Sequence, residues 1–109
     1  MKHYQHPTRE QLNLATVLYA LSDSVRLDFV RCLASSACEK ACGAIATTVA
    51  KSTMSHHLRV LREAGIVRVR TEGTQSLISI RHDDLEARFP GVLASILRAV
   101  EATAEAPAG

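Results

Sequence analysis

The sequence contains no apolar run of about 18 residues, so a membrane-spanning helix is excluded. No apolar stretch follows the polar and charged start over 1–7, so we expect no secretory signal and a cytoplasmic protein. Several enzyme motifs are missing as well: there is no phosphate-binding loop, no nucleophile elbow and no HExxH zinc motif. The adjacent His56 and His57 have no paired carboxylate in their basic surroundings. These absences favour a protein that is not an enzyme.

The chain has the length and composition of one globular domain, with 109 residues of which 47% are hydrophobic and 22% charged. We expect this domain to span 1–109, with frayed ends over about 1–8 and 104–109. A chain this short buries only about two thirds of its surface when it folds alone. A partner subunit would therefore add to its stability.

The net charge of +2 is unevenly distributed along the chain. Residues 51–82 hold six Lys and Arg against two Asp and Glu, whereas residues 83–109 hold two against five. A basic segment on a small domain suits contact with a phosphate backbone, although a solvated charged surface has the same composition. Charge alone does not distinguish a DNA-binding surface from a solvated one, and the sequence motif within 51–82 is needed for that.

Apolar residues recur at helical spacing in several segments, which predicts a mainly α-helical fold. The first stripe consists of Leu14, Val17, Leu18 and Leu21, and we expect Thr8 to cap its helix. The expected helices cover 10–21, about 23–34, about 42–49, 52–64, 83–88 and 90–103.

Gly65 is placed to close the helix over 52–64, and the period of the pattern then changes. Residues 66–70 alternate apolar with basic side chains, Gly73 supplies a turn residue, and 77–80 form a second apolar run. This pattern predicts a β-hairpin. Helix, helix, short helix, long helix and hairpin is the element order of a winged helix-turn-helix. The fold class we expect is therefore mainly α with a β-hairpin wing.

Two motifs carry a resemblance to a known family. Residues 51–67 (KSTMSHHLRVLREAGIV) match the recognition-helix pattern Ser-x-x-Ser-x-His-Leu-x-x-Leu-x-x-Ala-Gly-Leu-Val, with Ile66 standing for the leucine. Residues 20–27 (ALSDSVRL) match a Leu-x-Asp-x-x-Arg-Leu entry to the second helix. On these motifs the chain, from about residue 12 to residue 100, resembles the ArsR/SmtB family of bacterial repressors. The resemblance implies a homodimeric repressor of an inverted-repeat operator, with the dimer formed by the first and last helices.

Side chains suited to DNA contact cluster on this helix and on the hairpin. Ser52, Thr53 and Ser55 place hydroxyls at the N-terminal end of the helix, where the helix dipole also attracts phosphate. Arg59 and Arg62 project from the side expected to be exposed and can contact guanine or phosphate. The expected DNA-binding residues are Lys51, Ser52, Thr53, Ser55, His56, His57, Arg59, Arg62, Arg68, Arg70 and Thr74.

Some of these positions also have a purely structural interpretation. His57 lies between apolar positions, so it is either a packed histidine or a DNA contact. Arg68 and Arg70 alternate as on any solvent-facing strand, yet together with the basic helix they favour DNA. Glu72, beside the hairpin turn, opposes close contact with phosphate. A winged helix that binds another protein instead of DNA stays open as a second class of function.

A dimer is expected because one recognition helix covers only one half-site of an operator. Two such helices about 34 Å apart require a twofold axis between two chains. The alternative is that the apolar stripes of the first and last helices pack on the core of their own chain. The expected interface residues are Leu14, Val17, Leu18, Leu93, Ile96, Leu97 and Val100.

The three cysteines are Cys32, Cys38 and Cys42, and a cytoplasmic protein would keep them reduced. If the chain is helical between them, Cys38 and Cys42 share one face and could bind a soft metal or metalloid or act as redox thiols, whereas Cys32 falls at a core position. The Cys-x-Cys spacing of the metalloid sensors in the ArsR/SmtB family is missing, as is the Asp-x-His zinc box on the last helix. We expect no required cofactor, and a soft-metal effector stays a hypothesis.

Overall fold

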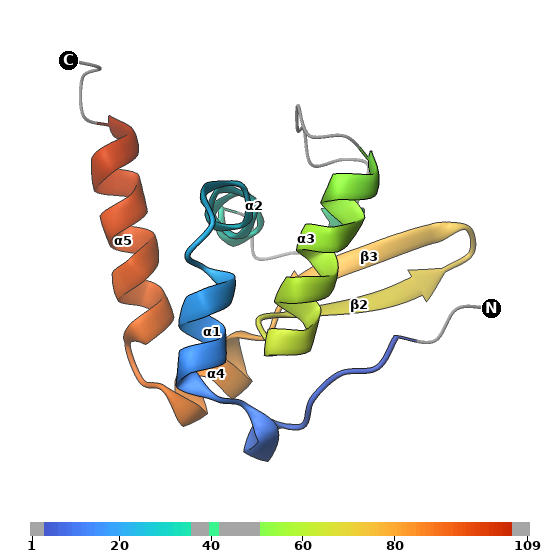
Figure 1. Cartoon of the computed structure of the whole chain (residues 1–109), viewed down its shortest axis with the longest axis horizontal. Helices are drawn as coiled ribbons and strands as arrows, with labels where there is room; N and C mark the ends of the chain where they lie inside the picture. The colour runs from blue at the N-terminus through green and yellow to red at the C-terminus, as the bar shows by residue number, and fades with distance from the viewer. Residues whose placement is uncertain (1–3, 36–39, 42–50, 106–109) are drawn as a thin grey trace.

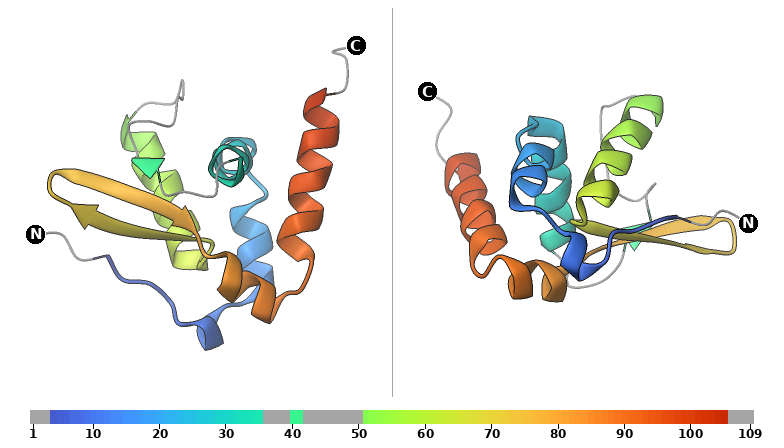
Figure 2. Two further views of the ribbon diagram at one scale, coloured as in Figure 1. Left: turned by 180° about the vertical axis from the view of Figure 1, so that it is seen from behind. Right: turned by 60° about the horizontal axis from the view of Figure 1, so that its bottom comes forward.

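A computed structural model describes residues 4–35, 40–41 and 51–105 of the chain (Figure 1). In chain order its elements are η1 (Arg9–Gln11), α1 (Leu14–Ala20), α2 (Ser24–Ala34), β1 (Lys40–Ala41), α3 (Lys51–Ala64), β2 (Val67–Glu72), β3 (Gln75–Ile80), α4 (His82–Arg88) and α5 (Val92–Glu105). The hairpin of β2 and β3 lies beside α3, and α5 stands at the opposite end of the molecule (Figure 2).

This arrangement confirms the predicted winged helix-turn-helix, with the hairpin as the wing. The predicted short helix over 42–49 lies outside the described residues. None of the helices in the described part of the chain has the length and apolar character needed to span a membrane.

The first helical segment is divided, contrary to the single helix predicted over 10–21. The 3-10 turn η1 is closed by Gln11, whose Oε1 accepts a hydrogen bond of 2.8 Å from the backbone N–H of Thr8. Leu12 then lies buried, and Oδ1 of Asn13 accepts a hydrogen bond from the backbone N–H of Thr16 to begin α1. Asn13 caps α1 because its short side chain reaches the unpaired N–H groups of the first turn. The break in the helix brings Leu12 into the core.

The C-terminal end of α3 has the predicted glycine motif. Gly65 has a φ of 86°, a conformation that residues with a Cβ rarely adopt. The N–H of Ile66 donates to the C=O of Leu61, and the N–H of Gly65 donates to the C=O of Arg62. This pair of hydrogen bonds is a Schellman motif. The chain therefore turns directly from α3 into β2, which fixes the wing relative to the helix.

The sheet contains three described strands in the order β1-β3-β2, so β2 lies at an edge. β2 and β3 pair antiparallel from Val67↔Ile80 to Glu72↔Gln75, which makes both strands longer than predicted. Gly73, with a φ of 62°, and Thr74 form the turn. The two residues of β1 pair antiparallel with β3. This strand was not predicted because a pair of residues shows no alternation.

The core lies where α1, α2, α3 and the base of the hairpin meet. Its large, fully buried side chains are Val30, Leu61, Ile66, Val67 and Ile78. From α5, the residues that pack against this core but stay partly exposed are Leu93, Ile96 and Leu97.

The apolar stripe predicted on the first helix is divided between core and surface. Val17 is 3% exposed, so it belongs to the core of its own chain and not to an exposed interface as predicted. Leu14 is 40% exposed, Leu18 45% and Tyr19 65%. Among the described residues, these three are the large hydrophobic side chains that folding leaves at the surface. α1 thus keeps an uncovered apolar surface.

Candidate nucleic-acid interface

The outer face of α3 carries polar and basic side chains, while Met54 and Leu61 of the same helix are buried in the core. Helical periodicity separates the two sets, because positions three or four apart lie on the same side. Lys51 and Ser52 are the first two residues of α3, but the structure does not describe their side chains. The predicted DNA-binding residues exposed on this face are Thr53, Ser55, His56 and Arg59.

His57 faces inward from α3 and connects it to α2. The residue is 9% exposed, and its Nδ1 lies 3.2 Å from Nη1 of Arg26. Nδ1 accepts this hydrogen bond, because a guanidinium can only donate. Arg26 is buried too, and its Nε donates to the C=O of Ala20 at the end of α1 at 2.7 Å. His57 is therefore a packed histidine that joins three helices, which corrects its place in the predicted DNA-binding set.

Asp23 caps the N-terminus of α2, next to the contact between Arg26 and His57. Its Oδ2 accepts hydrogen bonds from the backbone N–H groups of Val25 at 3.0 Å and Arg26 at 3.1 Å. The hydrogen bond from Arg26 lowers the pKa of the Asp23 carboxyl, and the charge of the Arg26 guanidinium acts in the same direction. The Asp-x-x-Arg part of the sequence motif thus caps α2 and holds α3 against α1 and α2.

The segment over 4–8, predicted to fray, is held against the edge strand β2. Nε2 of His6 accepts a hydrogen bond of 3.0 Å from the backbone N–H of Val69. Burial lowers the pKa of the His6 imidazole, and the positive charges of nearby arginines, Arg62 foremost, lower it further. The contact requires the neutral imidazole, since a protonated Nε2 cannot accept a hydrogen bond.

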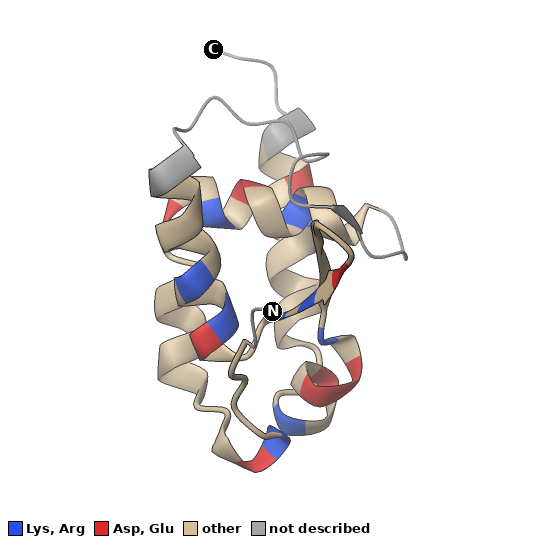
Figure 3. Cartoon of the chain, turned by 90° about the vertical axis from the view of Figure 1, so that its right-hand side faces the viewer, with Lys and Arg blue, Asp and Glu red and all other residues tan. Residues whose placement is uncertain are grey.

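Further contacts fix this N-terminal segment on both sides of His6. The Tyr4 hydroxyl lies 3.4 Å from Oγ of Ser76, and the C=O of Pro7 accepts a hydrogen bond of 2.8 Å from Nη1 of Arg81. The guanidinium carbon of Arg62 lies 5.2 Å from the centre of the Tyr4 ring, a cation–π contact. Seen from the wing, the segment descends between α3 and the hairpin (Figure 3). Arg62, a predicted DNA-binding residue, is therefore partly covered.

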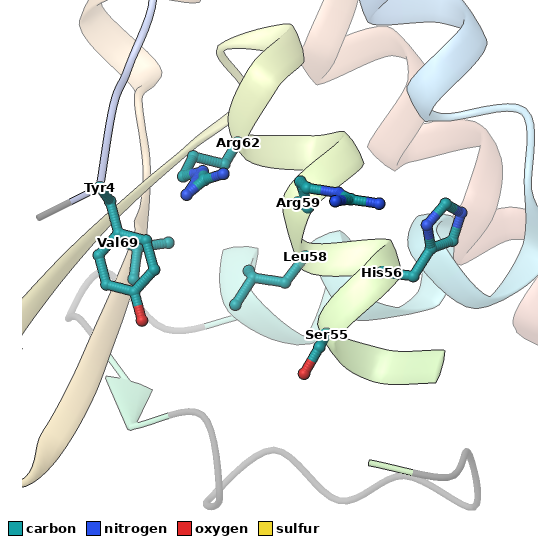
Figure 4. A pocket seen from close by; sticks show the side chains of 7 residues that line it. All are labelled: Tyr4, Ser55, His56, Leu58, Arg59, Arg62 and Val69. Carbon is teal, nitrogen blue, oxygen red and sulfur yellow. The ribbon is translucent and has the colours of Figure 1, made fainter. Parts of the chain in front are cut away.

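A groove of about 410 Å³ lies between α3, the N-terminal segment and β2. Arg62 extends across it toward Tyr4 (Figure 4). Among the described residues, its lining includes two guanidinium groups and no carboxylate, so this part of the groove is positively charged. The lining residues are Tyr4, Ser55, His56, Leu58, Arg59, Arg62 and Val69.

The wing exposes the predicted Arg68 and Arg70 on the outer face of β2, and Thr74 at its turn. Nη1 of Arg70 lies 2.8 Å from a carboxylate oxygen of Glu72, and Nη2 of Arg68 lies 3.7 Å from one of Asp84. The exposed Arg70–Glu72 ion pair contributes little to stability, so Arg70 can exchange this carboxylate for a phosphate. Arg68 is itself exposed, whereas its partner Asp84 is mostly buried. The carboxylate of Glu72 reduces the positive charge near the tip of the wing, as the sequence suggested.

Comparison with known proteins places these features in a family. The helix-turn-helix domain family matches residues 21–70, which include α2, α3 and the first part of β2. The uncharacterized HTH-type transcriptional regulator YceK from Bacillus subtilis (strain 168) is 34% identical over 84 residues, which cover 75% of this chain and 84% of the relative. The chain belongs to the helix-turn-helix transcriptional regulators. The matched region contains α3, whose exposed face carries the polar and basic side chains described above.

The wing of the regulator is anchored at its base by Asp84 of α4. Its Oδ1 accepts a hydrogen bond of 2.8 Å from Nε of Arg9, and its Oδ2 accepts one of 2.9 Å from Nε of Arg81. These two hydrogen bonds lower the pKa of the Asp84 carboxyl, with Arg9 the larger cause. The cluster joins η1, α4 and Arg81, the residue between β3 and α4, where the hairpin leaves the core.

Of the three cysteines, Cys32 lies among the described residues of the regulator. Cys38 and Cys42 lie outside the described residues, and Cys32 on α2 is half-buried with Nη2 of Arg31 3.9 Å from its Sγ. Over 4–35, 40–41 and 51–105, no group of three His, Cys, Asp or Glu side chains could hold a metal ion. The thiol-effector hypothesis stays a prediction about Cys38 and Cys42.

Proposed function

We propose that this regulator is a homodimeric repressor of the ArsR/SmtB type that binds an inverted-repeat operator. The observation that carries the proposal is the outer face of α3, where Ser55, His56 and Arg59 lie exposed beside a positively charged groove and the wing. The match of residues 51–67 to the recognition-helix pattern supports the same assignment.

In this proposal the N-terminal half of α3 enters the major groove of the operator. Ser55 and His56 can donate hydrogen bonds to base edges or phosphates, and Arg59 can bind guanine or phosphate through two parallel hydrogen bonds. The wing follows α3 directly through Gly65, so Arg68 lies toward the DNA backbone flanking the major groove. Base contacts from α3 would select the sequence, and backbone contacts from the wing would fix the orientation.

The proposed dimer uses the uncovered surface of α1 together with α5. Leu14 and Leu18 expose apolar area that the chain does not bury by itself. On α5, Leu93, Ile96 and Leu97 are only partly covered, and a second copy could cover them. A twofold axis through these helices would present two copies of α3 to two inverted half-sites.

The experiment that tests DNA binding measures the affinity for a short mixed-sequence duplex at several salt concentrations. Arg59→Gln removes an exposed guanidinium from α3, so the slope of log K against log salt should become about 0.9 less steep. Arg98→Gln is the matched control, because it removes the same charge from the exposed surface of α5. This control should bind with the slope of the parent.

Two outcomes would contradict the proposed function. If Arg59→Gln and the parent share one slope, the outer face of α3 is not the contact surface. If the parent shows salt-insensitive binding or no binding, the chain is a winged helix that serves another purpose, such as association with a protein.

A further inference from the structure

The groove between α3 and the wing lies where a DNA strand would have to pass. A protein that places a helix in the major groove and a hairpin toward the neighbouring minor groove straddles the phosphate strand that separates these two grooves. In this chain the space between the two elements is the groove of about 410 Å³, with Arg59 and Ser55 on the α3 side and Val69 on the β2 side.

The lining of this groove matches a phosphate in charge and hydrogen-bonding chemistry. Arg59 and Arg62 supply guanidinium donors, Ser55 supplies a hydroxyl and His56 an imidazole. In the part of the chain that the structure describes, no carboxylate belongs to the lining. Arg59 is exposed, and its guanidinium points away from Tyr4 toward His56 (Figure 4), so it has to rotate to reach a phosphate in the groove. The guanidinium of Arg62 lies against the aromatic ring of Tyr4.

Tyr4 holds the Arg62 guanidinium through its face, at 5.2 Å from ring centre to guanidinium carbon. Stacking on the face leaves the N–H groups at the edge of the guanidinium free to donate to an acceptor in its plane. Nε of Arg62 is buried and has no hydrogen-bond acceptor among the described residues. Because Nε is buried, a phosphate in the groove would accept hydrogen bonds from the terminal Nη groups of Arg62.

The position of Tyr4 is itself fixed by the N-terminal segment. His6 accepts a hydrogen bond from Val69 on the edge of β2, and Pro7 accepts one from Arg81. The Tyr4 hydroxyl reaches Ser76 on β3 at 3.4 Å. These contacts tie the segment to the wing, so the aromatic wall of the groove keeps its place beside α3.

We propose that this groove binds a phosphate of the DNA backbone through Arg59 and Arg62, and that Tyr4 is the positioning residue that holds Arg62 for this contact. The proposal rests on the proposed function, since it names a further part of the same DNA interface. It extends that interface from α3 and the wing to the N-terminal segment.

The test compares four variants in the same salt titration of the short mixed-sequence duplex. Arg62→Gln should make the slope about 0.9 less steep, which corresponds to roughly eightfold weaker binding at about 0.1 M salt. Tyr4→Leu should show a similar loss, because the guanidinium is no longer held. Tyr4→Phe keeps the ring and should bind like the parent. Combining Tyr4→Leu with Arg62→Gln should add no further loss, since both act on one contact.

Phe89→Leu is the matched control, because Phe89 also lies against an arginine, with the guanidinium carbon of Arg88 at 5.8 Å from its ring centre, but is at the C-terminal end of α4. This variant should keep the parent slope. A thermal melt of each variant separates folding from binding: a tyrosine with only a structural role would lower the melting temperature and leave the salt slope of the folded protein unchanged.

The outcomes distinguish this inference from the proposed function. If Arg59→Gln reduces the slope while Arg62→Gln and Tyr4→Leu keep it, the phosphate site is overturned and the recognition surface stands. If the parent itself binds without salt dependence, the proposed function fails first. Should Tyr4→Leu fail to fold, an unchanged slope in Arg62→Gln would still overturn the phosphate site.

Discussion

Replacing Gly65 by alanine should destabilise the regulator more than the same change at another left-handed glycine. With φ at 86°, a Cβ at position 65 costs about 1–2 kcal/mol from backbone conformation alone. The added Cβ would also collide with Cδ2 of Leu12 and lie 3.3 Å from Cγ of Pro7. Overpacking of this kind typically costs a further 1–3 kcal/mol or so, which brings the expected loss to about 2–5 kcal/mol.

Gly91 provides the matched control for this prediction. Its φ is 79°, but a Cβ added there meets nothing within 4 Å, so Gly91→Ala should lose only about 1–2 kcal/mol. The assay is urea unfolding followed by circular dichroism, with the free energies of unfolding compared at equal m-values. Equal losses in the two variants would refute the argument that Leu12 packs against the end of α3. A milder loss for Gly65→Ala in a Leu12→Ala background would identify the colliding atom.

Two further predictions concern assembly and acid. Leu18→Glu places a charge on the uncovered surface of α1, so it should shift the sedimentation of the protein from dimer toward monomer. Thr16→Glu changes another exposed residue of the same helix and should leave the dimer intact. A dimer that survives Leu18→Glu would contradict the proposed interface. Folding lowers the pKa of His6, so the folded protein favours the neutral imidazole. The contact of His6 therefore stabilises the fold above the ordinary imidazole pKa of about 6.5, and this stabilisation is lost as the pH falls below that value. The loss of unfolding free energy between about pH 7 and pH 5 should therefore be smaller in His6→Gln, and an equal loss in both proteins would rule out this role of His6.

The parts of the fold that were predicted from sequence are those with local signals. The helix over 52–64 has a clear apolar stripe and a closing glycine, and Gly65 adopts the left-handed conformation that such a glycine allows. The hairpin follows from the change to a period of two and from Gly73 at its turn. Two helices were expected over 83–88 and 90–103, and they lie at His82–Arg88 and Val92–Glu105, so α5 begins after Pro90 and not at it.

The parts that were not predicted depend on contacts between distant residues. The predicted stripe begins at Leu14, and the break in front of it brings Leu12 into the core. Asn13, a favoured N-cap residue, was the local signal for this break. Burial of His57 depends on Arg26, which is 31 positions away in the chain. The N-terminal segment has no periodicity, and its place beside the wing results from contacts of Tyr4, His6 and Pro7 with β2, β3 and Arg81.

The most direct test of the central claim is a selection of duplexes from a random library by the parent protein, followed by sequencing. A dimer that reads DNA with two copies of α3 should enrich an inverted repeat whose half-site centres lie about one helical turn, or roughly 34 Å, apart. A library that shows no enrichment, or enrichment of a single asymmetric site, would contradict the proposed mode of DNA binding.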